Sequence, residues 1–186
     1  MTIFSLAIAN WELNIEYSTL AVARLKFDRG DYSGAISLYN LEIEVNGRDA
    51  ESIFQRGKCQ QFLGNYSQAI QDYNQSLSID PDRAEVYYML GLLHDLFGRQ
   101  SLAMFNYCRT ISLDPHHAEA LVSRSFAYYH LDSTDAVIPD LRAALNIFLD
   151  RGNNDRAKDI VESIALLSSL TSFNVPLKNL PESSHA

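Results

Sequence analysis

The chain has 186 residues, 47% of them hydrophobic and 20% charged, which is typical of a globular protein and argues against a disordered one. Its net charge of −8 argues against nucleic-acid binding, because proteins that follow the phosphate backbone concentrate Lys and Arg. The length is enough for one domain with a sizeable core, or for an equivalent array of repeats.

Residues 1–15 are predicted to form an N-terminal extension or capping segment, with a first helix running from near Asn10 to Arg29. The apolar stretch from Ile3 to Ala9 is too short to span a membrane, and no Lys or Arg precedes it as in a signal peptide. Cys59 and Cys108 show no metal-ligand spacing and are expected to be reduced thiols. We therefore expect a cytoplasmic protein with no membrane insertion.

A period of 34 residues organises the middle of the chain. The positions that recur are Gly57, Gly64, Ala69, Tyr73, Leu77 and Pro81, which return as Gly91, Gly98, Ala103, Tyr107, Ile111 and Pro115. The same register extends back to Gly30, Ala35 and Tyr39, and more faintly forward to Val137 and Leu141. A fixed period of this size predicts one supersecondary unit that is copied and stacked.

Each repeat holds two segments with helical periodicity separated by Gly or Asp, which predicts two helices and a turn. The predicted repeats are residues 16–49, 50–83, 84–117 and 118–151. Gly30, Gly64 and Gly98 are predicted to end first helices in the left-handed conformation. The predicted helix caps are Asn65 with Gln68 in a capping box, and Asp80 and Asp114 with Pro81 and Pro115 in the first helical position.

The chain after the fourth repeat starts as a further repeat would. Gly152 and Ala157 have the spacing of Gly64 and Ala69, so residues 152–172 are predicted to form a helix that caps the last repeat. Residues 173–186 contain two prolines and a Ser-Ser-His-Ala ending, and we expect a flexible tail there.

The recurring Gly, Ala, Tyr and Pro positions resemble the tetratricopeptide repeat (TPR) family. The resemblance implies an all-α fold, a right-handed α-solenoid of about four helix-turn-helix repeats plus a C-terminal capping helix. Repeats 50–83 and 84–117 match best, whereas the flanking two carry Ala23 and Ser125 at the position of Gly57. The run from Phe148 to Asn153 also resembles the ending of many cyanobacterial members of the family.

No constellation of residues in the sequence indicates catalysis. Every glycine that can be placed serves a repeat or a turn, and no strained serine elbow or matched Ser/His/Asp set is present. His116 and His117 have no acidic or thiol partner at metal-ligand spacing. We therefore expect no enzyme activity, no metal site and no cofactor.

The candidate binding surface follows from helical geometry. The second, fifth, ninth and twelfth positions of each first helix share a stripe, which stacking places on a concave groove. The candidate peptide-binding residues in this groove are Arg24, Phe54, Lys58, Tyr88, Leu92, Phe126 and Tyr129. The recurring acids Glu51, Glu85 and Glu119 are interpreted as helix-dipole partners.

The TPR resemblance implies that peptide segments bind in this groove. The clamp of Lys, Asn and Arg with which some members hold a C-terminal carboxylate is not matched, because the corresponding positions hold Leu20, Arg24, Lys58, Tyr88 and Leu92. We therefore expect a non-catalytic adaptor or scaffold whose partner is a protein segment, apolar with some acidic character, with assembly of a multi-subunit complex as one such role. The alternatives are a homo-oligomer whose groove is covered by its own chain, and a binding surface on the convex side.

Overall fold

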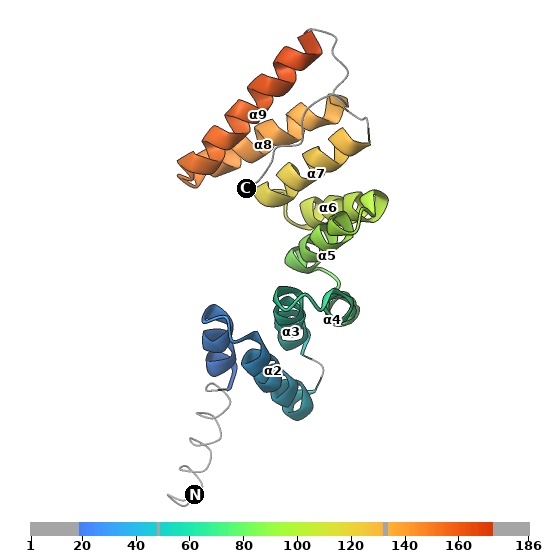
Figure 1. Cartoon of the computed structure of the whole chain (residues 1–186), viewed down its shortest axis with the longest axis vertical. Helices are drawn as coiled ribbons and strands as arrows, with labels where there is room; N and C mark the ends of the chain where they lie inside the picture. The colour runs from blue at the N-terminus through green and yellow to red at the C-terminus, as the bar shows by residue number, and fades with distance from the viewer. Residues whose placement is uncertain (1–18, 48, 132–133, 173–186) are drawn as a thin grey trace, which may run out of the picture. The chain divides into compact units, whose positions relative to one another are not determined.

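The computed structural model describes residues 19–47, 49–131 and 134–172, and in this described part all regular secondary structure is helical (Figure 1). The chain divides into two compact parts, Met1–Leu93 and His94–Ala186. The predicted N-terminal extension, the predicted start of the first helix near Asn10 and the predicted tail lie outside the described residues.

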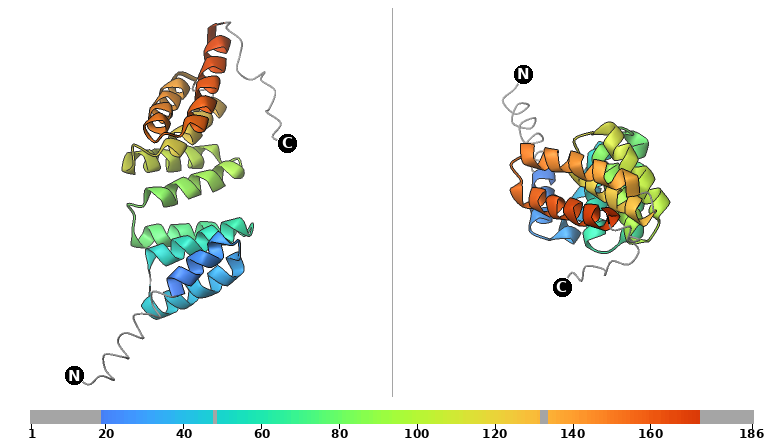
Figure 2. Two further views of the ribbon diagram at one scale, coloured as in Figure 1. Left: turned by 90° about the vertical axis from the view of Figure 1, so that its left-hand side faces the viewer. Right: turned by 90° about the horizontal axis from the view of Figure 1, so that it is seen from above.

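The N-terminal part is built from antiparallel helix pairs. Residues 19–28 are helical, and α2 (Tyr32–Asn46), α3 (Ala50–Phe62), α4 (Tyr66–Ile79) and α5 (Ala84–Leu96) follow, with the end of α5 at the boundary between the two parts. Helix α3 packs against both α2 and α4 (Figures 1 and 2). This arrangement confirms the predicted alternation of first and second helices.

The C-terminal part continues the pattern with α6 (Gln100–Leu113), α7 (Ala118–His130), a short 3-10 helix η1 (Thr134–Ala136), α8 (Val137–Asp150) and α9 (Asn154–Ser172). Helix α7 packs against α6 and α8, and α9 packs on α8 (Figure 2). Ala157 and Ile160 of α9 join Ala144 and Phe148 of α8 in one buried cluster, so α9 covers the apolar face of the last repeat. The predicted capping helix is confirmed.

The predicted glycine turns are also confirmed. Gly30, Gly64 and Gly98 have φ values of 77°, 77° and 66°, a left-handed conformation in which a Cβ atom would be strained. Gly152, before α9, has φ 69° and ends α8 in the same way. The backbone therefore turns at these glycines after the first helices of the first three repeats.

The predicted caps at Asp80 and Asp114 are wrong, whereas Asn65 does hold the predicted N-cap position of α4 but without a capping bond from its side chain. The side chain of Asn65 makes no cap bond, and its Nδ2 donates to Gln60 Oε1 at 2.9 Å. The carboxylates of Asp80 and Asp114 accept from backbone N–H groups two residues later, at 3.3 and 2.9 Å, and so form local turns. Pro81 and Pro115 consequently lie in these turns, and α5 and α7 begin three residues after the prolines.

Asp49 and His117 cap two of the first helices, α3 and α7. Asp49 Oδ2 accepts from Ser52 N at 2.7 Å and caps α3. His117 Nδ1 accepts from Ala120 N at 3.2 Å and caps α7. One of the two adjacent histidines therefore has a structural role. Both caps immediately precede the first helix of a repeat, where the first backbone N–H groups have no partner within the helix.

The small residues of the repeat allow paired helices to approach. Ala35, Ala69 and Ala103 have no exposed surface, and Tyr39, Tyr73 and Tyr107 four residues later are at most 1% exposed. Two buried clusters result among the N-terminal helices, one around Tyr39 and Cys59 and the other around Tyr73 and Phe54. The tyrosine rings thus fill the space beside each alanine contact.

Candidate binding surface

The candidate residues divide between the two parts of the chain. Arg24, Lys58, Tyr88 and Leu92 come from the first helices of three successive repeats in the N-terminal part, and we call this surface the first-helix face. Arg24 is exposed, whereas the other three are partly buried. Phe126 and Tyr129 lie on α7 in the C-terminal part, where Phe126 is 53% exposed and Tyr129 packs against the local core.

Phe54 is a core residue, so its assignment to an accessible groove is corrected. Its side chain is 0% exposed and its ring lies 5.7 Å from the ring of Tyr73, in a cluster with Val86 and Leu90. Lys58 Nζ and the Arg83 guanidinium cover the ring, at 5.3 and 5.1 Å from its centroid. The fifth position of this helix faces the neighbouring first helix, and α5 fills the space that a ligand would need.

The charges on the first-helix face are largely paired. Lys58 Nζ lies 3.4 Å from Glu85 Oε1, and Arg83 pairs with Glu51. Burial tends to raise the pKa of Glu51, but hydrogen bonds from Arg83 and Gln55 outweigh it and the pKa is lowered. Glu85 therefore links two neighbouring repeats and Glu51 pairs with the end of its own repeat, roles beyond that of helix-dipole partner.

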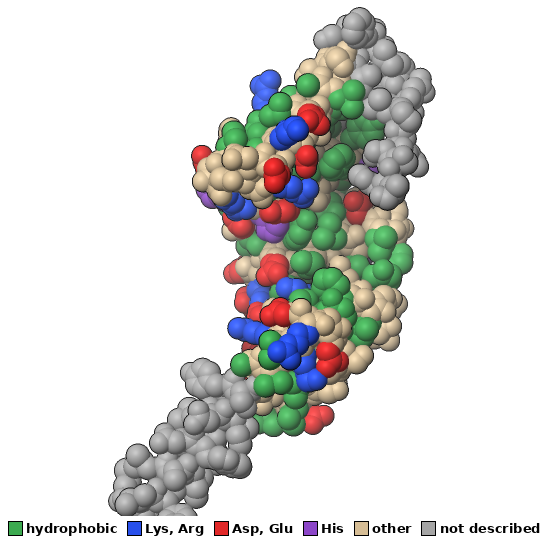
Figure 3. Space-filling model, turned by 60° about the vertical axis from the view of Figure 1, so that its left-hand side comes forward, with side chains coloured by type: hydrophobic (Ala, Val, Ile, Leu, Met, Phe, Trp, Pro, Cys, Tyr) green, Lys and Arg blue, Asp and Glu red, His purple; other side chains and the backbone are tan. Residues whose placement is uncertain are grey.

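Arg24 differs from these cations. Its guanidinium makes no hydrogen bond or ion pair with any residue that the structure describes, although its charge acts on Tyr39 and Glu51. Figure 3 shows basic and acidic side chains close together in the lower part of the view. Arg24 is thus the candidate residue whose charge has no direct partner on this face.

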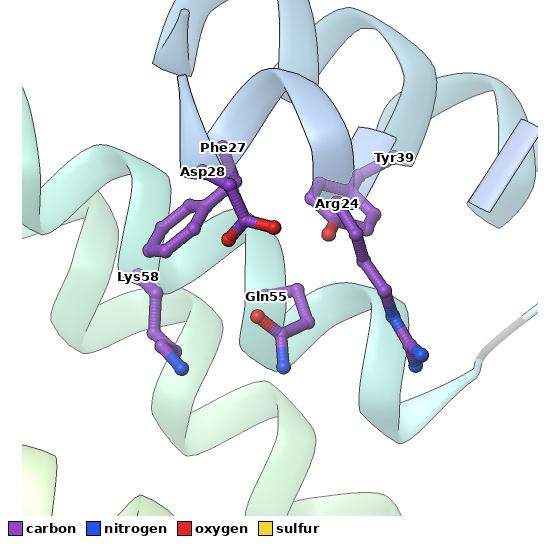
Figure 4. Close-up of a pocket in the computed structure, with 6 residues that line it drawn as sticks. All are labelled: Arg24, Phe27, Asp28, Tyr39, Gln55 and Lys58. Atoms are coloured by element: carbon purple, nitrogen blue, oxygen red, sulfur yellow. The ribbon is translucent and has the colours of Figure 1, made fainter. Parts of the chain in front are cut away.

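A pocket of about 220 Å³ opens beside Arg24 (Figure 4). Its lining consists of Arg24, Phe27 and Asp28 from the helix before α2, Tyr39 from α2, and Gln55 and Lys58 from α3. Sequence reasoning found Arg24 and Lys58 but missed Asp28, Tyr39 and Gln55 as site residues. The sequence carries one indication of the pocket, because Phe27 stands at the position that Gln61 holds in the next repeat.

An aromatic cluster lies next to the pocket. The ring of Phe27 packs edge-on against Tyr32 and Phe62, with centroids 5.4 and 5.3 Å apart, and Tyr32 stacks on Phe62 at 4.9 Å. Phe62 is nevertheless 60% exposed. Lys58 Nζ lies 5.5 Å from the Phe27 centroid and so connects the cluster to the first-helix face. The pocket therefore has a polar interior and an apolar rim.

Neither metal binding nor a membrane span is indicated in the part of the chain that the structure describes. Within residues 19–47, 49–131 and 134–172, no group of three or more His, Cys, Asp or Glu residues is arranged to hold a metal ion. No helix among these residues combines the length and the apolar character needed to cross a membrane.

Comparison with known proteins identifies the fold. Residues 63–95 match a family model described as TPR repeat, and residues 84–117 match one described as tetratricopeptide repeat. No curated protein matches the chain. Solved structures are similar over most of its length. For MamA from Desulfovibrio magneticus RS-1 the TM-score is 0.65 at 17% identity, covering 84% of this chain and 95% of that one.

Two further solved structures are similar. The thermophilic TPR protein TTC0263 of Thermus thermophilus has a TM-score of 0.60 at 17% identity, covering 83% of this chain and 92% of that one. The TPR domain of Arabidopsis OM64 has a TM-score of 0.59 at 20% identity, covering 63% of this chain and 97% of that one. At such identities the likeness concerns the fold alone. The repeat matches show that residues 63–117 contain tetratricopeptide repeats, and the solved structures show that the fold is an all-α solenoid.

Proposed function

We propose that the chain is a non-catalytic adaptor that binds a segment of a partner protein on the first-helix face of its N-terminal part. The observation that carries this proposal is the pocket beside Arg24, which combines a hollow, a charge without a direct partner and an exposed aromatic rim. A few apolar anchors around a concavity with a small number of polar groups are what peptide recognition requires.

The partner segment is proposed to be mainly apolar with limited acidic character. Phe62 and the half-buried Leu92 offer apolar contacts. Because Lys58 is engaged with Glu85, and Arg83 with Glu51, only Arg24 remains to attract an acidic group among the described cations of this face. A strongly acidic partner would have to displace Glu51 and Glu85 from their cations, so one acidic residue near the apolar anchors fits better.

The C-terminal part offers a second apolar surface of its own on α7, where Phe126 is 53% exposed and Tyr129 lies nearby on the same helix. A chain with an exposed aromatic surface in each part suits the assembly of a multi-subunit complex, in which an adaptor holds more than one segment. The exposure of Phe62 and Phe126 also favours the alternative, a homo-oligomer in which a second copy covers them.

Site-specific photo-crosslinking tests the proposal. A crosslinking amino acid placed at position 24 or 88 in cells is expected to capture one partner segment, which mass spectrometry identifies. The matched control is position 45 on α2, where Val45 is 71% exposed outside the first-helix face. Capture only from position 45 would transfer the binding site to the other surface.

Affinity measurements with the identified segment complete the test. Arg24→Glu is expected to weaken binding about tenfold at low salt, with a smaller effect at high salt, because the interaction of exposed charges is screened. Val45→Ser is expected to leave the affinity unchanged. Light scattering across protein concentration examines the homo-oligomer, and crosslinks from position 24 to a second copy of the chain would favour it over the adaptor.

A further inference from the structure

Tyr39 and Tyr73 hold the same position in successive repeats but have different hydroxyl environments. The Tyr73 hydroxyl donates to Gln61 Oε1 at 2.7 Å. In the preceding repeat the residue equivalent to Gln61 is Phe27, whose ring cannot accept such a bond. Tyr39 and the Phe27 ring that stands in place of the amide both line the pocket.

The Tyr39 hydroxyl is buried without a partner. Its residue is 1% exposed, and the hydroxyl makes no hydrogen bond within the described part of the chain. Burial raises the pKa of Tyr39 to about 12, so the hydroxyl keeps its proton near neutral pH and remains a donor. Buried polar groups are nearly always satisfied, and an unpaired one at a pocket wall points to a bound group.

The groups facing Tyr39 are acceptors. Gln55 donates through Nε2 to Glu51 Oε1 at 2.7 Å, which turns its oxygen toward the pocket. Figure 4 shows the Asp28 carboxylate and the Tyr39 hydroxyl facing each other, with the Gln55 oxygen on the same side. Asp28 has no hydrogen bond or ion pair to a described residue. The inner pocket thus combines one donor with two acceptors.

The net charge around the pocket is close to neutral. The charge of Asp28 is offset by that of Arg24, and Lys58 is paired with Glu85. A carboxylate would meet Asp28, and an ammonium would meet Arg24 and Lys58. A neutral group with both an acceptor and donors is complementary to all of them, and the primary carboxamide has that composition.

We propose that this pocket binds a primary carboxamide, the side chain of an Asn or Gln in the partner segment. Its C=O accepts from the Tyr39 hydroxyl, and its NH₂ donates to Asp28 and Gln55. The origin of the amide in a protein segment rests on the proposed function, whereas the amide preference rests on the pocket alone. A volume of about 220 Å³ accommodates the group, and ordered water is the competing occupant.

Small-molecule titration followed by NMR tests the preference without any partner. Acetamide is expected to shift the signals of residues 24–28, 39 and 55–58 in a saturable way, and acetate and methylammonium are expected to bind at least about threefold more weakly. Tyr39→Phe should weaken acetamide binding about fivefold, the loss of one neutral hydrogen bond. Tyr73→Phe is the matched control and should leave it unchanged, because that hydroxyl bonds Gln61.

Phe27→Gln provides a second variant. It restores the amide found in the next repeat, so the new side chain should accept from the Tyr39 hydroxyl as Gln61 does from Tyr73, and abolish acetamide binding. Equal shifts with the three probes, or unchanged binding by Tyr39→Phe, would overturn the proposal in favour of water. Preference for acetate would overturn it in favour of a carboxylate site.

The adaptor function and the amide-binding pocket can be tested separately. A partner crosslinked at position 24 whose bound segment has no Asn or Gln at the pocket would overturn the amide assignment and leave the adaptor intact. Acetamide binding without any crosslinked partner segment would support the amide-binding pocket and count against the adaptor.

Discussion

Arg56 and Asp72 join the two helices of the second repeat through a pair of hydrogen bonds, Nη2 to Oδ1 at 2.5 Å and Nε to Oδ2 at 3.0 Å. The same pairing returns two repeats later between Arg124 and Asp140, with both bonds at 2.7 Å. In the first repeat the equivalent positions hold Val22 and Leu38. Two repeats thus hold an ion pair at these positions, the first holds two apolar residues, and the third holds Leu90 and Asn106.

The difference between the first and the second repeat predicts the outcome of a double-mutant cycle. Arg56→Val should cost about 2 to 3 kcal/mol in the free energy of unfolding, because it leaves the largely buried Asp72 carboxylate without its partner. Arg56→Val with Asp72→Leu copies the first repeat and should recover most of that loss. Urea unfolding measures both. A double variant as unstable as the sum of the single ones would show that the apolar solution is specific to the first repeat.

Loss of the hydroxyl group is predicted to affect the free energy of unfolding differently at Tyr73 and at Tyr39. Tyr73→Phe removes the bond to Gln61 Oε1 and should cost about 1 kcal/mol. Tyr39→Phe removes a buried hydroxyl with no partner in the described chain, and should leave the free energy of unfolding unchanged or slightly higher. Thermal unfolding of the two variants side by side makes the comparison. An equal loss at both positions would mean that bound water satisfies Tyr39 in the free protein.

From the contact at Gly57 we predict that a residue of one repeat is not tolerated at the equivalent position of another. A Cβ at Gly57 would lie 2.8 and 2.9 Å from ring carbons of Tyr73, so Gly57→Ala should crowd the ring. The steric cost of about 1 to 3 kcal/mol exceeds the helix-propensity gain of about 1 kcal/mol. The first repeat has Ala23 in that place, and Ala23→Gly should cost about 1 kcal/mol there. Stabilisation by Gly57→Ala in urea unfolding would contradict the tight contact.

The fold was largely predictable because it depends on periodic, local requirements. The left-handed turns at Gly30, Gly64 and Gly98 and the close contacts at Ala35 and Ala69 each require a particular residue type at a fixed spacing. The helix caps were harder to predict, because the carboxylate of an Asp before Pro can accept a hydrogen bond either from the first turn of the next helix or within its own turn. At Asp80 the turn is favoured, and α5 begins later.

The site was less predictable because periodicity gives the direction of a side chain but not its depth. Phe54 and Lys58 lie on the same stripe, yet α5 buries the first and leaves the second partly open. Tyr39 belongs to a second helix, so the stripe of first-helix positions does not include it. Its role in the pocket follows from a difference between repeats, Phe27 in the first and Gln61 in the second. A comparison that looks for positions that repeat does not reveal such a difference.

The cap of α3 predicts a pH dependence of stability. Partial burial tends to raise the pKa of Asp49, but hydrogen bonds from Ser52 and from the backbone of Glu51 outweigh it, and the pKa is lowered. A carboxyl group whose pKa is lower in the folded state contributes stability above its unfolded pKa, about 3.9, and loses it as the pH falls through the lower folded value. Asp49 therefore stabilises the protein at neutral pH and ceases to do so in acid.

Two substitutions separate the charge of Asp49 from its hydrogen bonds. Asp49→Ala should cost about 1 kcal/mol at neutral pH, and Asp49→Asn less, because an amide oxygen still accepts from Ser52 N. The difference between wild type and Asp49→Asn isolates the contribution of the carboxylate, and it should shrink as the pH is lowered from about 6 to about 2. Thermal unfolding across that range measures the difference, in which the titration of other carboxylates cancels. A difference that stays constant with pH would assign the cap to hydrogen bonding alone, with no part for the charge.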